Sequence, residues 1–253
     1  MGARYWTGTD SAGQVPERRH SRVGGLEAID WTAVWLSIRL SVATAAILAL
    51  IGMPIAYWLA FTRRRWRPLV EALVALPLVL PPTVLGFYLL VAMGPNGPLG
   101  ALYEGATGRL LPFTFGGLLI ASVLFSLPFA VQPFTVAFAS VDLALIEASW
   151  TLGRSPAATF ARVILPLSTG GIIAGLVLAF AHTLGEFGVV LMVGGNIAGE
   201  TRTISIAIYD RVQALDYNAA AATAFALLLV SFTVLALTYG LRGTSLLLWP
   251  RRH

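Results

Sequence analysis

The segment from Glu147 to Pro166 reads EASWTLGRSPAATFARVILP, and it holds the clearest local pattern in the chain. It lies between two long apolar segments. At its start, Leu143, Ile146 and Trp150 recur at helical spacing, so they would form one apolar face of a short helix. This spacing predicts a short amphipathic helix outside the apolar segments.

A turn and a second helix are predicted to follow. Gly153 interrupts the apolar spacing, and glycine adopts the positive φ of a tight turn without a steric penalty. Ser155 and Pro156 are typical of the N-cap and first position of a helix, and Pro166 is expected to mark the change into the next apolar segment. Residues 141–166 are therefore predicted to form a helix–turn–helix hairpin.

This hairpin is polar enough to lie on the face of a membrane. We expect Glu147, Arg154 and Arg162 to be exposed on it, which favours a surface that docks against another molecule. The pattern alone leaves a second interpretation open, in which residues 141–166 are an ordinary connecting loop.

The composition identifies a membrane protein. The chain has 253 residues, of which 57% are hydrophobic and 11% are charged, whereas an average soluble domain carries roughly 25% charged residues. So few charges could not cover a soluble globule, and the many Leu, Val, Ala and Phe residues exclude a disordered chain. All 17 basic residues are arginine and there is no cysteine, which excludes thiol catalysis and a phosphate-binding lysine. The arginines lie between apolar runs rather than on one dense face, so no nucleic-acid partner is expected.

Five apolar windows are long enough to cross a bilayer as helices, which requires about 20 residues each. They span residues 34–61, 69–93, 116–140, 167–193 and 219–241. Their only charged side chains are Arg39, Glu71 and Glu186. Because the runs are continuously apolar, they favour helices over spanning strands, whose side chains would alternate. The predicted fold is an all-α integral membrane bundle of five spans.

The remaining segments suggest an orientation. Residues 1–33 are expected to be a polar, disordered tail outside the cytoplasm, and residues 242–253 a basic cytoplasmic tail. Four arginines crowd the loop 62–68, and cytoplasmic loops are enriched in positive charge. We therefore expect the N-terminus outside, and the hairpin and C-terminus in the cytoplasm.

The hairpin resembles the EAA motif of ABC-importer permeases, which reads E-A-A, three residues, G, nine residues, I-x-L-P. The matching positions are Glu147, Ala148, Ser149, Gly153, Val163, Leu165 and Pro166. Ser149 replaces the second alanine of the motif and Val163 replaces its isoleucine. The resemblance implies a coupling helix that inserts into a groove of a separate ATP-hydrolysing subunit, where Glu147 would face a basic side chain.

Two further stretches narrow the resemblance to molybdate permeases. The first is LPLVLPPTVLGFYLL at residues 76–90. The second is LGEFG at 184–188, followed by GNI at 195–197 and TRTI at 201–204. The likeness extends from about residue 31 to 242 and implies a type I ABC-importer permease in a bacterial or archaeal plasma membrane. Sulfate and tungstate permeases share part of these motifs and stay open as alternatives.

The expected partners follow from the resemblance, together with the motifs that the chain lacks. It has no G-x-x-x-x-G-K-[ST] motif and no lysine, so it cannot cradle ATP phosphates itself. We expect it not to be an enzyme and to bind no cofactor or metal, with ATP and Mg²⁺ held by two ABC ATPase subunits. The other expected partners are a second copy of the chain, an extracytoplasmic molybdate-binding protein and the lipid bilayer. Transport would proceed by alternating access.

Individual side chains in the windows receive weaker predictions. Glu186 is expected to be structural or gating, either capping backbone amides or pairing with an arginine such as Arg202, and His182 to be a hydrogen-bonded packing residue. Thr83, Gly86 and Ser126 are candidates for the anion path, although interior hydroxyls most often bond their own helix or a neighbour. Arg39 is expected to reach the headgroups and Glu71 to lie at a solvated or arginine-paired helix end.

Two other classes of membrane protein are weaker interpretations. An ion-coupled secondary transporter would need buried carboxylates or an inverted repeat, and five spans do not divide into two halves. An intramembrane enzyme would need a catalytic constellation, but His182 and Glu186 do not form an H-E-x-x-H motif.

Overall fold

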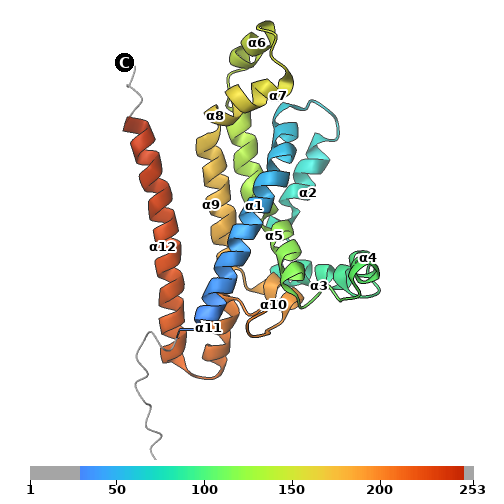
Figure 1. Ribbon diagram of the computed structural model, residues 1–253, viewed down its shortest axis with the longest axis vertical. Helices are drawn as coiled ribbons and strands as arrows, with labels where there is room; N and C mark the ends of the chain where they lie inside the picture. The colour runs from blue at the N-terminus through green and yellow to red at the C-terminus, as the bar shows by residue number, and fades with distance from the viewer. Residues whose placement is uncertain (1–28, 248–253) are drawn as a thin grey trace, which may run out of the picture.

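The computed structural model describes residues 29–247, and its regular elements there are all helical (Figure 1). The predictions for residues 1–28 and 248–253 lie outside this range. The elements are α1 (Trp31–Phe61), α2 (Arg67–Val79), α3 (Pro82–Met93), α4 (Pro98–Thr107), α5 (Phe115–Ala139), α6 (Leu143–Thr151), α7 (Pro156–Thr159), the π-helix η1 (Phe160–Ile164), α8 (Leu165–Leu167), α9 (Thr169–Gly185), α10 (Gly188–Gly194), α11 (Ile204–Gln213) and α12 (Tyr217–Leu247).

Within the described range, three helices are long and apolar enough to cross a membrane alone, namely α1, α5 and α12. Two further spans are possible if each of two bent pairs counts as one. One pair joins α2 to α3 with a bend of 111°, and the other joins Pro156–Leu167 to α9 with a bend of 74°. The first bend divides the second predicted window between α2 and α3. The fourth predicted window, residues 167–193, begins at the second bend and is itself divided between α9 and α10, which are separated by Glu186 and Phe187.

The bend after α2 has a local cause. Leu80 and Pro81 both have extended backbone angles, with ψ near 135°. A proline disfavours the helical conformation of the residue before it, so two successive prolines end α2 and let α3 restart with Pro82 in its first position. The apolar run continues through the bend although the helix does not.

The bundle has two distinct ends (Figure 1). The loop between α1 and α2, the short helices α6 to α8 and the last turns of α12 lie at one end. The start of α1 and the helices α3, α4, α10 and α11 lie at the other. The arginine-rich loop and the predicted hairpin therefore share one end of the molecule.

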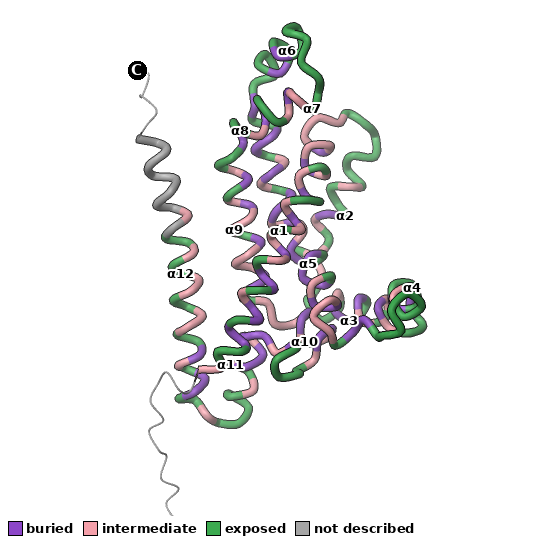
Figure 2. The backbone as a smooth tube through the Cα atoms, in the orientation of Figure 1, coloured by how far each residue is buried: buried purple, intermediate pink, exposed green. Residues whose placement is uncertain are grey.

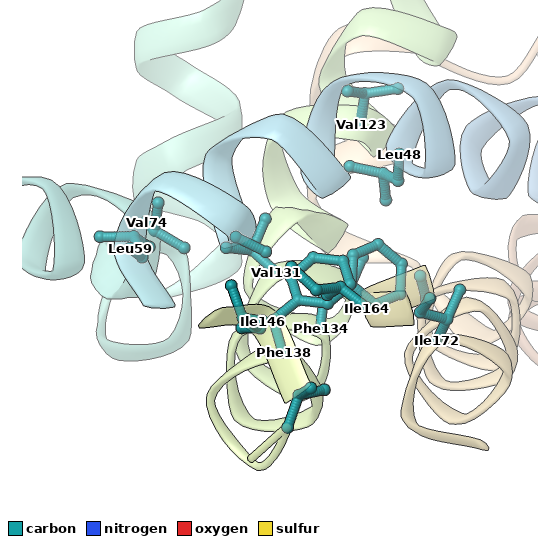
Figure 3. Packing of buried hydrophobic residues seen from close by; sticks show 14 residues of the cluster. Leu48, Leu59, Val74, Val123, Val131, Phe134, Phe138, Ile146, Ile164 and Ile172 are labelled. Carbon is teal, nitrogen blue, oxygen red and sulfur yellow. The ribbon is translucent and has the colours of Figure 1, made fainter. Parts of the chain in front are cut away.

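The core is built around α5, against which α1 and α9 pack. Leu48, Val131, Phe134 and Phe138 are among its buried side chains (Figure 3). Gly175 allows α9 to approach closely, because a Cβ there would lie 2.7 Å from Cε1 of Phe134. Lipid removes the hydrophobic drive between helices, so such close packing is what holds membrane helices together.

The last helix is peripheral. Only 17% of its apolar window is buried, compared with 56% for that of α5. Phe225, Leu228 and Phe232 are exposed on α12. This face is available to lipid or to another subunit.

Candidate functional site

The hairpin forms as the sequence predicts. The Asp142 carboxylate accepts a hydrogen bond from the Ala144 amide at 2.9 Å and caps α6. Gly153 has φ of +73° at the turn, and the hydroxyl of Ser155 caps α7, with Pro156 in its first position. The predicted turn and second helix start are confirmed, and Glu147, Arg154 and Arg162 are exposed as expected.

One buried hydrogen bond joins the two arms of the hairpin. The hydroxyl oxygens of Ser149 and Thr159 lie 2.9 Å apart, and both residues are buried. Ile146 and Ile164 also belong to the main core cluster (Figure 3). Ser149, which departs from the motif's alanine, thus has a role inside the chain, and the hairpin is packed onto the bundle rather than hanging from it.

The outer side of the hairpin is open (Figure 2). Glu147 and Ala148 are exposed there. Trp150 is 51% exposed and Leu152 is 81% exposed. Large apolar side chains gathered with polar ones on a surface are typical of a protein contact site. Of the predicted apolar face, only Ile146 points into the bundle.

The second arm ends in an irregular turn that the sequence analysis missed. Residues Phe160–Ile164 form a π-helix, and the Leu165 amide donates to the Phe160 carbonyl. Pro166 lacks an N–H and its ring would crowd the carbonyl four residues earlier, so a wider turn relieves the clash. Pro166 is predicted to mark the change into the next apolar segment, and the 74° bend before α9 comes two residues later, at Ser168. The Ser168 hydroxyl donates to the Ala137 carbonyl at 3.1 Å and ties this bend to α5.

At the opposite end, small residues bring α3 and α10 together. A Cβ on Gly86 would lie 2.8 Å from Cβ of Met192, and one on Gly188 would lie 2.7 Å from Cβ of Pro82. Gly86, expected in the anion path, is therefore buried in a helix contact, while Thr83 is exposed near the start of α3.

Ser126 is engaged between two helices. Its hydroxyl lies 2.8 Å from the hydroxyl of Thr183 and 3.0 Å from Nδ1 of His182. The ring of His182 stacks on Phe129 with centroids 3.9 Å apart. These contacts link α5 to α9, so Thr83, Gly86 and Ser126 have three different environments. His182 has the hydrogen bond and packing expected of it.

Glu186 lies between α9 and α10 and caps the second helix. Its Oε1 accepts a hydrogen bond from the Val189 amide at 2.9 Å. Of the two structural roles expected for this carboxylate, the geometry matches amide capping. Capping suits the position, because the first amides of a helix have no partner within it.

Arg202 pairs elsewhere, in a polar cluster that the sequence analysis did not anticipate. Its Nε donates to Oδ1 of Asn196 at 2.6 Å, and Nδ2 of Asn196 donates to Oδ2 of Asp210 at 2.6 Å. The guanidinium also lies 3.8 Å from the Asp210 carboxylate and 4.0 Å from that of Asp30. Because Asp30 caps α1, this cluster joins the start of α1 to α11 and the loop before it.

Two other expected charges have simple surroundings. Arg39 is exposed on α1, with its guanidinium carbon 4.5 Å from the centroid of the Phe115 ring. Glu71 forms an exposed ion pair with Arg67 at 2.8 Å, the arginine-paired helix end that was anticipated. Among the described residues, no group of three or more His, Asp and Glu side chains could hold a metal ion.

Arginine is distributed unevenly between the two ends. In the part of the chain that the structure describes, the loops and short helices of the hairpin end carry Arg63, Arg64, Arg65, Arg67, Arg154 and Arg162. Those of the opposite end carry Arg109, Arg202 and Arg211. The site thus has two parts: a basic end with an exposed apolar contact surface, and an opposite end at which α3 and α10 pack closely.

Comparison with known proteins gives three findings. Residues 36–242 match the model of a family described as the binding-protein-dependent transport system inner membrane component. The chain is 50% identical over 213 residues to the molybdenum transport system permease protein ModB of Azotobacter vinelandii, covering 84% of this chain and 94% of that protein. Its fold is similar to two solved structures at lower identity. One is the MetNI methionine ABC transporter in inward-facing conformations, with TM-score 0.65, 16% identity, and coverage of 83% of this chain and 92% of the other. The second is a bacterial alginate ABC transporter in complex with a periplasmic protein bound to an alginate pentasaccharide, with TM-score 0.63, 18% identity, and coverage of 81% and 76%.

Proposed function

The chain belongs to the family of binding-protein-dependent transport system inner membrane components, and from this premise we propose that it is the membrane-spanning permease subunit of an ATP-driven molybdate importer. The substrate rests on the relative from Azotobacter vinelandii, a molybdenum transport permease that is half identical over nearly its whole length. The likeness to solved ABC transporters supports the fold of such a subunit.

The exposed side of the hairpin is the observation that carries the coupling role. Trp150 and Leu152 present apolar surface beside the exposed carboxylate of Glu147. Such a mixed surface suits insertion into a groove of an ATPase subunit, with Glu147 facing a basic side chain there. ATP hydrolysis and Mg²⁺ then belong to that partner, and this chain binds no cofactor.

The contacts of the hairpin provide a route by which a pull on it would reach the far end. The hydrogen bond between Ser149 and Thr159 holds the arms together, and Ile146 and Ile164 pack into the core. The movement then passes along α9, because Ser168 binds α5 at one end of this helix and Glu186 caps α10 beyond the other. Since α10 packs on α3 through Gly86, rocking the hairpin would shift α3 and α10 at the opposite end.

The assembly we propose contains two copies of this chain, two ABC ATPase subunits and an extracytoplasmic molybdate-binding protein. One protomer makes half of a pathway, and a two-fold axis between two copies would complete it. The solved alginate transporter is in complex with a periplasmic protein that carries bound alginate, which supports a corresponding partner for this chain. The orientation proposed below would put this partner at the end formed by α3, α4, α10 and α11.

The orientation follows from the arginines. The hairpin end carries six of them against three at the opposite end, counted over the described loops and short helices. Positive residues concentrate on the cytoplasmic side of membrane proteins. We therefore place the hairpin and the C-terminus in the cytoplasm and the start of α1 outside.

Reconstitution tests this function directly. The chain would be placed in liposomes with its ATPase and its binding protein, and ATP turnover would be measured with molybdate, tungstate and sulfate. We expect the molybdate-loaded binding protein to stimulate turnover most. Stronger stimulation by sulfate would contradict molybdate as the substrate. Oxyanion uptake without any ATPase would contradict the coupling of transport to ATP.

A further inference from the structure

An apolar groove runs between α1 and the start of the hairpin's second arm. Its volume is about 630 Å³. Its walls include Ala46, Ala49, Met53 and Tyr57 on α1, with Pro156 and Phe160 on the other side. The ring of Tyr57 packs edge-on against that of Phe160, with centroids 5.3 Å apart. None of the roles proposed above uses this groove.

The groove is long enough along α1 to hold an acyl chain within one leaflet. From Ala46 to Tyr57 it follows α1 for about 16 Å, at the helical rise of 1.5 Å per residue. One leaflet of the hydrocarbon core is about 15 Å thick. Leu50, also part of the lining, is 77% exposed, so the groove is open toward its surroundings along the helix.

Directly beyond the groove, the chain carries the marks of a membrane interface. Arg63, Arg64 and Arg65 are exposed in the loop that follows α1. The guanidinium carbon of Arg65 lies 5.3 Å from the centroid of the Trp66 ring, and Trp66 is 55% exposed. Tryptophan and arginine are typical of the headgroup level. The basic loop therefore lies where the phosphate of a lipid in the groove would be.

We propose that this groove binds the acyl chain of an anionic phospholipid, whose phosphate is held by the arginines of residues 63–65. Basic clusters at a membrane surface attract anionic headgroups. A second copy of the chain fits less well, because an isologous contact would bring its arginine loop toward this one. The lipid would contact both α1 and Pro156–Phe160, and would therefore join the bundle to the hairpin at the π-helix.

Lipid retention tests this site without any transport measurement. The protein would be reconstituted in nanodiscs of equal parts phosphatidylglycerol and phosphatidylcholine with identical chains, then transferred to detergent. Native mass spectrometry would count the lipids that stay bound. We expect phosphatidylglycerol to be retained at least fivefold over phosphatidylcholine, about the effect of one arginine near the surface. If the two lipids were retained in the ratio at which they are present in the nanodisc, the bound lipid would be adventitious and the proposed site would be wrong.

Two variants with matched controls separate the groove from the loop. Ala49→Trp fills the groove and should reduce bound phosphatidylglycerol at least fivefold, whereas Ala224→Trp on the exposed α12 should not. Arg64→Gln should keep a lipid but lower the preference for phosphatidylglycerol about fivefold, whereas Arg109→Gln at the opposite end should not.

Equal retention of phosphatidylglycerol by both tryptophan variants would exclude the groove as the binding site. If Ala49→Trp disrupted a dimer of the protein but left the amount of bound lipid unchanged, the groove would instead belong to the contact with a second copy of the chain. Each failure leaves the transport function intact.

Discussion

The two ends of the molecule use similar residues in opposite ways. At the hairpin, the carboxylate of Glu147 is exposed and a side chain on Gly153 would meet open space. At the far end, the carboxylate of Glu186 caps α10, and the place of a Gly86 side chain is filled by Met192. The first set is exposed and is the one we propose for contact with a partner, whereas the second makes contacts within the chain. Motif residues of the same types thus differ in burial at the two ends.

The strongest test of this contrast is Gly86→Val. A branched side chain would overlap Met192 and separate α3 from α10, and overpacking of this kind costs about 1 to 3 kcal/mol. We expect a lower thermal unfolding temperature of the detergent-solubilised protein. The control is Gly105→Ala, because Gly105 lies in the exposed α4, where an added Cβ would meet nothing within 4 Å. Equal destabilisation by both would contradict the close helix contact.

Glu147→Ala should leave the stability of the permease unchanged and weaken its binding to the ATPase subunit. Removing an exposed carboxylate leaves the fold unchanged, while losing an interface anchor costs about 2 kcal/mol, or roughly thirtyfold in affinity for the ATPase. The measurements are the dissociation constant of the ATPase subunit and the unfolding temperature of the permease. Glu104→Ala, on exposed α4 at the opposite end, is the control. A destabilised permease that still binds its ATPase normally would place Glu147 within the fold instead.

Gly153→Ala affects the hairpin through its backbone. The φ of +73° is strained for any residue with a Cβ, at a cost of about 1 to 2 kcal/mol. We expect weaker stimulation of ATP turnover by the binding protein, because the turn no longer holds the tip of the hairpin in place. Gly153→Asn should retain most of this stimulation, since asparagine tolerates the left-handed conformation. If alanine and asparagine behaved alike, the effect would not come from the turn.

The smallest effect is expected at Glu186. Loss of the cap in Glu186→Ala should cost about 1 kcal/mol, while Glu186→Gln keeps an oxygen that can accept the Val189 amide. The unfolding temperature should fall less for glutamine than for alanine. The relative stimulation of ATP turnover by molybdate and sulfate should not change in either. A change in that ratio would indicate that Glu186 takes part in substrate recognition. The control is Glu200→Ala, because Glu200 is exposed in the nearby loop.

Local patterns predicted most of the hairpin, because caps and turns depend on neighbouring residues. Gly153, Ser155 and Pro156 have the positions expected of them. The apolar windows gave the positions of the long helices, but an apolar run has the same composition whether it is straight or bent. The 111° bend at Leu80 and Pro81 therefore could not be found by counting apolar residues.

Contacts between residues far apart in the sequence could not be predicted from residue spacing. Arg202 meets Asp30, which is 172 positions away in the chain, and Ser126 meets Thr183 from another helix. Nothing local indicates which of several polar side chains will face each other once helices have packed. The assignment of Thr83, Gly86 and Ser126 to the anion path stays a prediction, and Gly86 and Ser126 have structural contacts of their own.

The π-helix at Phe160–Ile164 gives this stretch one more residue than an ordinary helical turn would hold. Successive residues of an ordinary helix are rotated by about 100° around its axis. A π-turn holds one residue more than an ordinary turn and takes it up with little rotation of the helix on either side, because its hydrogen bond spans five residues instead of four. A residue lost or gained in the ordinary turns next to it would rotate the hairpin and its exposed Glu147 by about 100°, whereas the loss of one residue within the π-turn would be absorbed.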